Sequence, residues 1–372
     1  MTTTRALHPV TAAQHLLPDD EPFAFVAADG SEAHPEFGGP ADGIARPDDH
    51  TLLDLHRRMV IGRRLDTQCT ALTKQGRLAV YPSARGQEAC EIGVTAGLRD
   101  QDWLFPTYRD TMAVLDRGVP VADALELLRG SWHCGWDPAQ HRVAPQCTPL
   151  ATNTLHAVGL AHAARLRGED TVAVVFIGDG ATSEGDTHEA FNVAAVWKAP
   201  VVFVVVNNGF AISVPLAKQT AAPSLAAKGI GYGMPGRRVD GNDVAAVYAS
   251  VRAAVESAAA GEGPTLIEAM TYRMEAHTNA DDAGRYRSAA DVEAWRDRDP
   301  VQRSTVYLSA RGVLNETVAA DIDAEAETRA AALRDVMNAD PVLDPAELFA
   351  HVYAEPTAVL RAQAAEVLEF SA

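Results

Sequence analysis

The sequence of 372 residues has few cysteines and no long apolar run. Its cysteines stand at positions 69, 90, 134 and 147 without a Cys-x-x-Cys spacing, which predicts neither a structural zinc site nor a disulfide framework. We expect free thiols in a reducing cytoplasm. No window reaches the roughly 18 apolar residues that a membrane span requires, and residues 1–20 lack the features of a secretory signal. The expected location is therefore the cytoplasm, with no membrane contact.

Positive charge is also scarce. The 32 Lys and Arg residues are outnumbered by 50 Asp and Glu residues, which gives a net charge of -18. Such a surface repels a phosphate backbone, and no basic cluster interleaved with aromatic residues offers a local exception. Nucleic acid is therefore not an expected partner. The chain does have 47% hydrophobic residues, enough to bury a large core.

The organisation of the chain changes near residue 49. Residues 1–48 are rich in Pro, Ala, Asp and Gly without sustained periodicity, which predicts an extended N-terminal arm. Residues 49–372 are expected to form a single domain, because no linker divides them. Its first helices are predicted over residues 52–75, 87–98 and 151–167.

The centre of the chain alternates short apolar runs with helical patterns. Strands are predicted over 171–177, 201–206, 237–240 and 265–271, and helices over 187–198 and 244–260. Nearly continuous apolar strands alternating with helices are typical of an α/β fold, a parallel sheet covered by helices on both faces. Residues 317–370 predict amphipathic helices that close the domain or dock on a subunit.

Two of the predicted strands end in polar loops. The first ends at Gly178-Asp179-Gly180 and the next at Asn207-Asn208-Gly209. A single crossover helix makes these strands neighbours, so Asp179 and Asn208 are expected close together at the carboxyl edge of the sheet. Their oxygens are half of a magnesium site, which usually retains water and ligand phosphates. The sequence therefore indicates a magnesium site at this edge, with room for a diphosphate.

Other interpretations exist for the same residues. Each motif alone is ordinary turn chemistry. A dinucleotide-binding oxidoreductase would also place glycines after a strand, and Gly178, Gly180 and Gly185 do so, but Ser183 occupies the usual third glycine position. Amides stand where the acidic ribose ligand of such proteins is expected. The metal interpretation is favoured because both motifs occur together.

The segment from Gly178-Asp179-Gly180 to Asn207-Asn208 resembles the thiamine diphosphate motif. Further blocks resemble the alpha subunit of 2-oxo acid dehydrogenases, in the family's order, over roughly residues 49–300. These blocks are Arg85-Gly86-Gln87-Glu88, Phe105-Pro106-Thr107-Tyr108-Arg109-Asp110, Thr148-Pro149-Leu150-Ala151-Thr152 and Thr271-Tyr272-Arg273 through Tyr286-Arg287. The resemblance implies a thiamine diphosphate-binding fold, with Mg²⁺ and thiamine diphosphate as cofactors.

The resemblance also assigns site residues. The metal ligands would be Asp179, Asn208 and the carbonyl of Phe210. The cofactor-binding residues would be Tyr108, Arg109, Thr148, Leu150, Gly178, Asp179, Gly180, Ala181, Asn208, Phe210 and His277. His277 would also transfer a proton during acyl transfer, and His133 is a second candidate catalytic imidazole.

Some positions depart from the family pattern. Val206 stands where some relatives carry an arginine or another polar residue that helps bind the diphosphate, so one such contact is in doubt. Thr278 and Ala280 replace the serines that are phosphorylated in mitochondrial relatives. The resemblance therefore does not extend to control by the dedicated kinase.

The function implied is decarboxylation of a 2-oxo acid and transfer of the acyl group to the lipoyl arm of an acyltransferase component. A beta subunit would complete the site in an α2β2 assembly. The blocks at 228–243 and 267–273 favour a branched-chain substrate over pyruvate, and acetoin-cleaving relatives are a further alternative. A non-catalytic member is disfavoured because Asp179, Asn208, Arg109 and His277 are all present.

Overall fold

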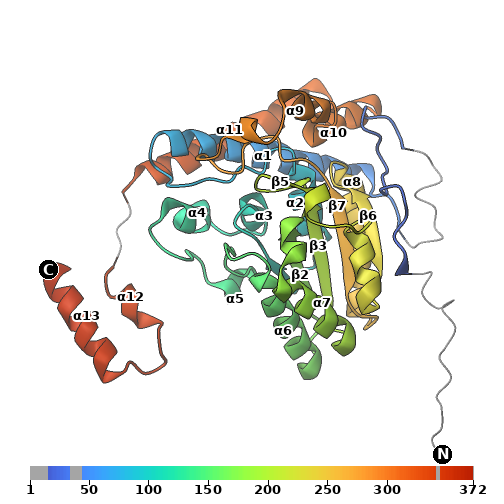
Figure 1. Cartoon of the computed structure of the whole chain (residues 1–372). Coiled ribbons are helices and arrows are strands. Elements are labelled where there is room, and N and C mark those ends of the chain that lie inside the picture. Colours follow the sequence, from blue (N-terminus) through green and yellow to red (C-terminus); the bar gives the residue numbers. More distant parts are fainter. Residues whose placement is uncertain (1–15, 34–43, 341–343, 372) are drawn as a thin grey trace, which may run out of the picture.

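A computed structural model describes residues 16–33, 44–340 and 344–371 of the chain (Figure 1). Its centre is a parallel sheet of five strands in the order β1-β2-β3-β7-β6. The strands are β1 (Trp103–Phe105), β2 (Ala173–Gly178), β3 (Val201–Asn207), β7 (Thr265–Met270) and β6 (Gly236–Asp240). The predicted α/β fold with a parallel sheet is confirmed.

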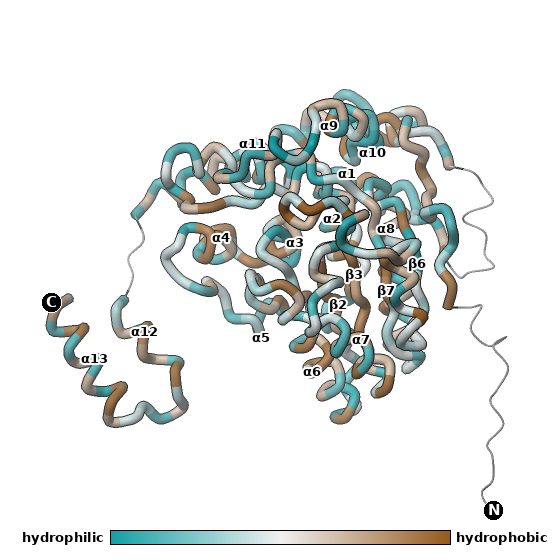
Figure 2. The backbone as a smooth tube through the Cα atoms, in the orientation of Figure 1, coloured by the Kyte–Doolittle hydropathy of each residue, from teal (hydrophilic) through white to brown (hydrophobic). Residues whose placement is uncertain are grey.

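Helices cover both faces of this sheet because its strands are apolar on both sides. Alternate residues of β2 point in opposite directions: Val174 and Phe176 pack toward α1 (Asp49–Lys74), α2 (Glu88–Gly97) and α8 (Val244–Ala259). Val175 and Ile177 pack toward α6 (Thr152–Arg167) and α7 (Gly185–Trp197). Figure 2 shows the apolar strands as brown segments between these helices.

The remaining elements surround this centre. The other helices are α3 (Thr111–Asp116), α4 (Val121–Arg129), α5 (Pro138–His141), α9 (Ala289–Arg296), α10 (Pro300–Ala310), α11 (Glu316–Asn338), α12 (Glu347–Ala350) and α13 (Ala358–Ser371). Short 3-10 turns are η4 (Gly180–Ser183), η5 (Leu216–Lys218), η6 (Ala226–Tyr232) and η7 (Ala283–Arg285), and β4 (Phe210–Ala211) pairs with β5 (Val214–Pro215). α11 lies along α1, and a third apolar cluster joins both helices to α4. None of the helices in the described ranges is long and apolar enough to cross a membrane.

The predicted helices and strands are present, and their ends differ from the predicted ones by at most three residues. The strand predicted from residue 171 begins at Ala173, because the Val172 amide, which faces β1, donates to Asp102 Oδ1 instead of to a backbone carbonyl. The helix predicted from residue 187 begins at Gly185. The C-terminal helices are confirmed, and Figure 1 shows α12 and α13 as a pair set apart from the main body. All four cysteines are free.

The N-terminal arm is described only in part, because residues 1–15 and 34–43 lie outside the described ranges. The part that is described packs on the domain. Phe23 bridges in parallel to Val239 of β6, and the amides of Phe25 and Val26 donate to the buried carboxylate of Asp243 at 2.7 and 2.8 Å. This segment therefore extends the sheet beyond its β6 edge.

The register between β2 and β3 positions the polar loops. Gly178, the last residue of β2, pairs with Val206, and the polar residues after each strand leave the same edge of the sheet. The predicted adjacency of the two strands is confirmed. Asp179 and Asn208 both line one cavity at that edge.

Candidate functional site

The cavity lies beyond the carboxyl ends of β2 and β3 and has a volume of about 180 Å³. Parallel α/β sheets bind their ligands at this position, because the loops after the strands expose backbone amides there. The cavity is lined by Gln87, Thr107, Tyr108, Arg109, Asp110, Leu150, Phe176, Ile177, Gly178, Asp179, Gly180, Ala181, Glu184, Val206, Asn208, Phe210, Ala211, Ile212, Arg273 and His277. Ten of the twelve site residues expected from the sequence are in this set, which leaves out only Thr148 and His133.

Asp179 is a buried carboxylate at the floor of the cavity, with 2% of its surface exposed. Its Oδ2 accepts a hydrogen bond from Gln219 Nε2 at 2.8 Å, and within the described residues it forms no ion pair. Burial raises the pKa of this carboxyl above its usual value, against the opposing effect of the Gln219 hydrogen bond. A buried acid without a cationic partner is the group that a metal ion stabilises most.

Asn208 is the second expected metal ligand, and its amide has a defined orientation. Its Nδ2 donates to Gln87 Oε1 at 2.9 Å, while its Oδ1 accepts from the Phe210 amide at 3.2 Å. Both Gln87 and Asn208 are buried and line the cavity. Because Gln87 takes up the NH₂ group, the carbonyl oxygen is the group of Asn208 that remains for a cation.

The turn after Asn208 brings Phe210 to the cavity. Gly209 has φ +82°, a conformation that favours glycine and lets the chain reverse direction into β4. The Phe210 ring lies 6.3 Å from the Tyr272 ring and 5.8 Å from the Tyr286 ring, measured between centroids. The side chain is thus held by aromatic neighbours, and Phe210 itself lines the cavity.

Arg109, Tyr108 and His277 form another part of the cavity wall. Arg109 donates from Nη1 to the Ser83 carbonyl at 2.9 Å, and its Nη2 lies 3.0 Å from His277 Nδ1. The Tyr108 hydroxyl lies 3.5 Å from His277 Nε2. A guanidinium group and a phenol on a cavity wall are suited to binding phosphate oxygens.

Arg273 is a site residue that could not be singled out from the sequence. It is 1% exposed, lines the cavity, and its Nη1 lies 3.1 Å from His277 Nδ1. Its Nη2 donates to the Ile212 carbonyl and to the Tyr286 hydroxyl at 2.9 and 3.0 Å. The block that contains Arg273 resembles the family pattern, but nothing in the linear sequence indicates that its side chain turns toward Arg109.

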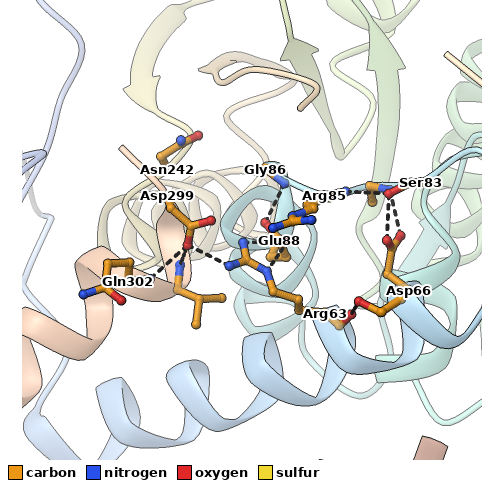
Figure 3. Close-up of polar contacts among 12 residues, drawn as sticks. Arg63, Asp66, Ser83, Arg85, Gly86, Glu88, Asn242, Asp299 and Gln302 are labelled. Atoms are coloured by element: carbon orange, nitrogen blue, oxygen red, sulfur yellow. Dashed lines mark hydrogen bonds and ion pairs between the residues drawn. The ribbon is translucent and has the colours of Figure 1, made fainter. Parts of the chain in front are cut away.

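Gln87 was missed for a similar reason, although it stands in another of the resembling blocks. It belongs to the loop of residues 81–87, which is held by two buried carboxylates, one from α1 and one from the start of α2 (Figure 3). Asp66 accepts from the Tyr81 hydroxyl, the Ser83 hydroxyl and the Ala84 amide at 3.0, 2.7 and 2.9 Å. This anchor fixes the Ser83 carbonyl that receives Arg109.

The second anchor is Glu88, a fully buried carboxylate at the start of α2. It accepts from Arg63 Nε at 2.7 Å and from the Gly86 amide at 2.9 Å. Arg63 also donates to Asp299 at 2.8 Å (Figure 3). Asp299 caps α10, because its side chain accepts from the amides of Val301 and Gln302. The loop that presents Gln87 is therefore joined to α1 and α10.

The other expected residues are placed as follows. Leu150 lines the cavity, and Val206 provides an apolar surface beside it. Thr148 is exposed and does not belong to the cavity lining. His133 is also exposed outside the lining, with its ring 5.0 Å from that of Trp132. The structure therefore does not bring these two residues to the cavity wall.

The donor groups fit a magnesium ion with a diphosphate. An unpaired buried carboxylate and an amide oxygen are the hard oxygens that Mg²⁺ prefers, and the cavity leaves room for phosphate oxygens. Arg109 and Arg273 add positive charge on the wall, and Arg273 Nε is buried without a hydrogen-bond partner. Within the described residues there is no cluster of three or more His, Cys, Asp or Glu side chains that could hold a metal ion. A metal here would thus depend on the ligand's own oxygens.

Comparison with known proteins shows the family of the chain. A family model described as "Dehydrogenase E1 component" matches residues 56–345. The chain is 50% identical, over 85% of its length and 86% of the relative's, to a protein of Mycobacterium tuberculosis named 3-methyl-2-oxobutanoate dehydrogenase subunit alpha. It is 42% identical, over 72% of its length and 73% of the relative's, to the pyruvate dehydrogenase E1 component subunit alpha of Staphylococcus aureus.

Proposed function

Because the chain belongs to the dehydrogenase E1 component family, as an alpha subunit of a 2-oxo acid dehydrogenase, we propose that it binds Mg²⁺ and thiamine diphosphate in the cavity beyond β2 and β3. Together with a beta subunit it would decarboxylate a branched-chain 2-oxo acid and transfer the acyl group to a lipoyl-bearing acyltransferase. Residues 49–372 would act as one cofactor-binding domain.

The observation that carries this proposal is the convergence of Asp179, Asn208, Arg109 and His277 on one cavity. These residues come from four separate loops, and the parallel sheet brings two of them to the same edge. Asp179 and the amide oxygen of Asn208 would hold the metal ion with the Phe210 carbonyl. Tyr108 and Arg109 would bind the phosphate oxygens, with Gly178, Gly180 and Ala181 allowing close backbone approach.

When bound, thiamine diphosphate supplies the electron sink that decarboxylation of a 2-oxo acid requires. This chain's own residues position the cofactor and shape its surroundings. Leu150 and Val206 give the cavity apolar surface that excludes water and strengthens the electrostatic interactions inside it. Arg273 would supply a second guanidinium group and so offset the polar contact that Val206 does not make. Roles for Thr148 and His133 would require that their segments contact the cofactor from outside the cavity lining described here.

The choice of substrate follows from the relatives. The relative named for 3-methyl-2-oxobutanoate matches at higher identity and over more of the chain than the relative named for pyruvate. We therefore place a branched-chain 2-oxo acid first and pyruvate second. Measuring activity on 3-methyl-2-oxobutanoate and on pyruvate with the same α/β preparation would decide between them, and a higher kcat/KM for pyruvate would reverse the order.

A beta subunit is proposed because both relatives are named as alpha subunits. The rim of the cavity offers a surface for such a partner: Ile212 and Val214 expose 54% and 42% of their area. Purified alpha chain alone should therefore show no decarboxylation with an artificial electron acceptor. Robust activity of the lone chain would contradict the assignment to a two-chain enzyme.

The cofactor proposal is tested by the variant Asp179→Ala. Titration of the α/β complex with thiamine diphosphate, followed by quenching of tryptophan fluorescence, should show saturable Mg²⁺-dependent binding that Asp179→Ala abolishes. The matched control is Asp186→Ala, because Asp186 is an exposed acid seven residues along the chain and outside the cavity. Metal-independent binding, or equal losses in both variants, would overturn the proposed site.

A further inference from the structure

Two arginines lie within hydrogen-bond distance of the same nitrogen atom of His277. Arg109 Nη2 lies 3.0 Å from His277 Nδ1, and Arg273 Nη1 lies 3.1 Å from it. The other ring nitrogen, Nε2, has the Tyr108 hydroxyl at 3.5 Å. The imidazole is therefore approached by two guanidinium groups on one side and by a phenol on the other.

The chemistry of arginine fixes the proton on this ring. A guanidinium group has only N–H donors and cannot accept a hydrogen bond, so the shared nitrogen of His277 must be the acceptor. A proton on Nδ1 would point an N–H group at two other N–H groups. The neutral ring therefore carries its single proton on Nε2.

The two arginines cannot easily turn away, because each has further partners. Arg109 also donates to the carbonyls of Ser83 and His277 at 2.9 and 3.1 Å. Arg273 donates to the Ile212 carbonyl and the Tyr286 hydroxyl. These bonds set the direction of both guanidinium planes before any ligand arrives.

The charges around the ring also favour its neutral form. Burial is the largest cause that lowers the pKa of His277, and the positive charges of Arg109 and Arg273 add to it, so that this pKa falls to about 4. Among the described residues, Asp281 is the acid that acts in the opposite direction, and its Oδ2 already accepts from the His277 amide at 2.8 Å and from the Tyr286 hydroxyl. At neutral pH the ring is thus uncharged.

We propose that Arg109 and Arg273 hold His277 as the Nε2–H tautomer, so that the ring donates a hydrogen bond to an anionic oxygen in the cavity and does not act as a base. This inference rests on the proposed function, and it replaces the proton transfer expected of His277 with hydrogen-bond donation. Nδ1 has its lone pair occupied, and Nε2 already carries the proton, so neither nitrogen accepts one from a substrate at neutral pH. Such a fixed donor stabilises negative charge on a phosphate oxygen or on the oxygen of a reacting carbonyl. Arg273 acts here as a positioning residue.

The tautomer can be observed directly by ¹⁵N nuclear magnetic resonance of the full chain labelled at histidine, with the His277 signal assigned by its loss in His277→Gln. We expect an unprotonated Nδ1 and a protonated Nε2 that do not change between pH 8 and about 5.5. A protonated Nδ1, or a titration near the ordinary histidine value, would overturn the proposal. This measurement needs no cofactor, so its outcome is independent of whether the chain binds thiamine diphosphate.

The role of Arg273 is tested with Arg273→Met, which keeps an apolar stem of similar length and removes the guanidinium. The titration of His277 should then move to higher pH by about one unit or more. Arg285→Met is the matched control, because Arg285 is an exposed arginine of the same segment and does not line the cavity. Equal titrations in wild type and Arg273→Met would contradict the proposal.

A third experiment, on the α/β complex, identifies the oxygen that accepts the hydrogen bond from His277 Nε2–H. Mg²⁺ with thiamine diphosphate is added first, followed by a methyl acylphosphonate that resembles a 2-oxo acid but cannot lose carbon dioxide. A shift of the Nε2–H signal at the first step assigns a diphosphate oxygen, and a shift only at the second assigns a substrate oxygen. If binding occurs in a separate fluorescence titration but neither step moves the signal, the donor role is wrong.

The conservative variants give an independent comparison. His277→Gln retains an amide N–H near the position of Nε2, whereas His277→Leu has no donor. The affinity of the complex for the ligand identified above should fall about tenfold in the leucine variant and markedly less in the glutamine variant. Equal losses in both variants would mean that a donor at this position is not sufficient, and would contradict the proposed role.

Discussion

Gln87 Oε1 accepts a hydrogen bond from Asn208 Nδ2 at 2.9 Å, between two side chains that are both buried. The two residues are 121 positions apart in the chain: Gln87 directly precedes α2, and Asn208 directly follows β3. Their contact decides which end of the Asn208 amide faces the cavity. A residue that touches no metal thus determines the group that the metal would meet.

The first prediction concerns this orientation. Gln87→Met removes the acceptor, so the Asn208 amide can rotate and present its NH₂ group to the metal. The affinity for Mg²⁺ with thiamine diphosphate should fall about tenfold, in keeping with the loss of one buried hydrogen bond. Gln87→Glu keeps an acceptor and should lose less. Calorimetric titration of the α/β complex measures both, and an unchanged affinity in Gln87→Met would refute the positioning role.

The second prediction concerns the buried ion pair behind the same loop. Glu88→Leu leaves Arg63 with Asp299 alone and removes the acceptor of the Gly86 amide. We expect the free energy of unfolding to fall by about 3 kcal/mol, because one partner of a buried pair is lost. Urea unfolding provides the measurement.

An exposed pair is the control for that experiment. Glu293 and Arg296 are 3.0 Å apart on the surface of α9, with most of both side chains in solvent. Glu293→Leu should change the stability by less than about 1 kcal/mol. If both leucine variants cost the same, burial of the pair at Glu88 has no special effect.

The third prediction concerns the glycine at the turn of this loop. Gly86 has φ +94°, and an added Cβ would lie 2.4 Å from the Tyr272 carbonyl oxygen. Gly86→Ala should therefore cost about 3 kcal/mol or more, since strain and overlap combine. Gly76 also has positive φ, +72°, but open space around it, so Gly76→Ala should cost only about 1 to 2 kcal/mol. Thermal unfolding of the two variants tests the difference, and equal losses would argue against the close contact at Gly86.

The fourth prediction concerns acid stability. Burial lowers the pKa of His56 to about 4, and its Nδ1 lies 3.1 Å from the Ser304 hydroxyl. In the unfolded chain a histidine takes up its proton near pH 6.5. The stability that depends on neutral His56 is therefore complete above pH 6.5 and is lost as the pH falls toward 4.

His56→Leu should remove this dependence. Between pH 7 and 4.5 the variant should lose less stability than the wild type, by up to about 3 kcal/mol. His50→Leu is the control, since His50 is exposed on the same helix. Parallel pH profiles for His56→Leu and wild type would show that the burial of His56 does not control acid unfolding.

Much of the fold could be predicted because its central strands are apolar on both faces. The runs at β2 and β3 can only be buried between two layers of helices, and a single helix between them makes them neighbours. The exact ends of helices and strands could not be predicted, because side chains distant in the sequence decide them. Asp102, for example, takes the Val172 amide out of the ladder.

The site residues that could be predicted are those that directly follow a strand. Asp179 and Asn208 stand at strand ends, so the topology of the sheet is sufficient to bring them to one cavity. Gln87 and Arg273 could not be found in this way, because their positions depend on long-range contacts that leave no periodic signal. Their hydrogen bonds span 121 and 61 residues.

The exposed apolar rim has a consequence for how the protein is made. Ile212 adopts a left-handed conformation with φ +56°, and Arg273 secures it by binding its carbonyl. A β-branched residue held in this way keeps its side chain in solvent until another molecule covers it. A surplus of this chain over its proposed beta partner would tend to aggregate. We therefore expect cells to synthesise the two polypeptides in matched amounts.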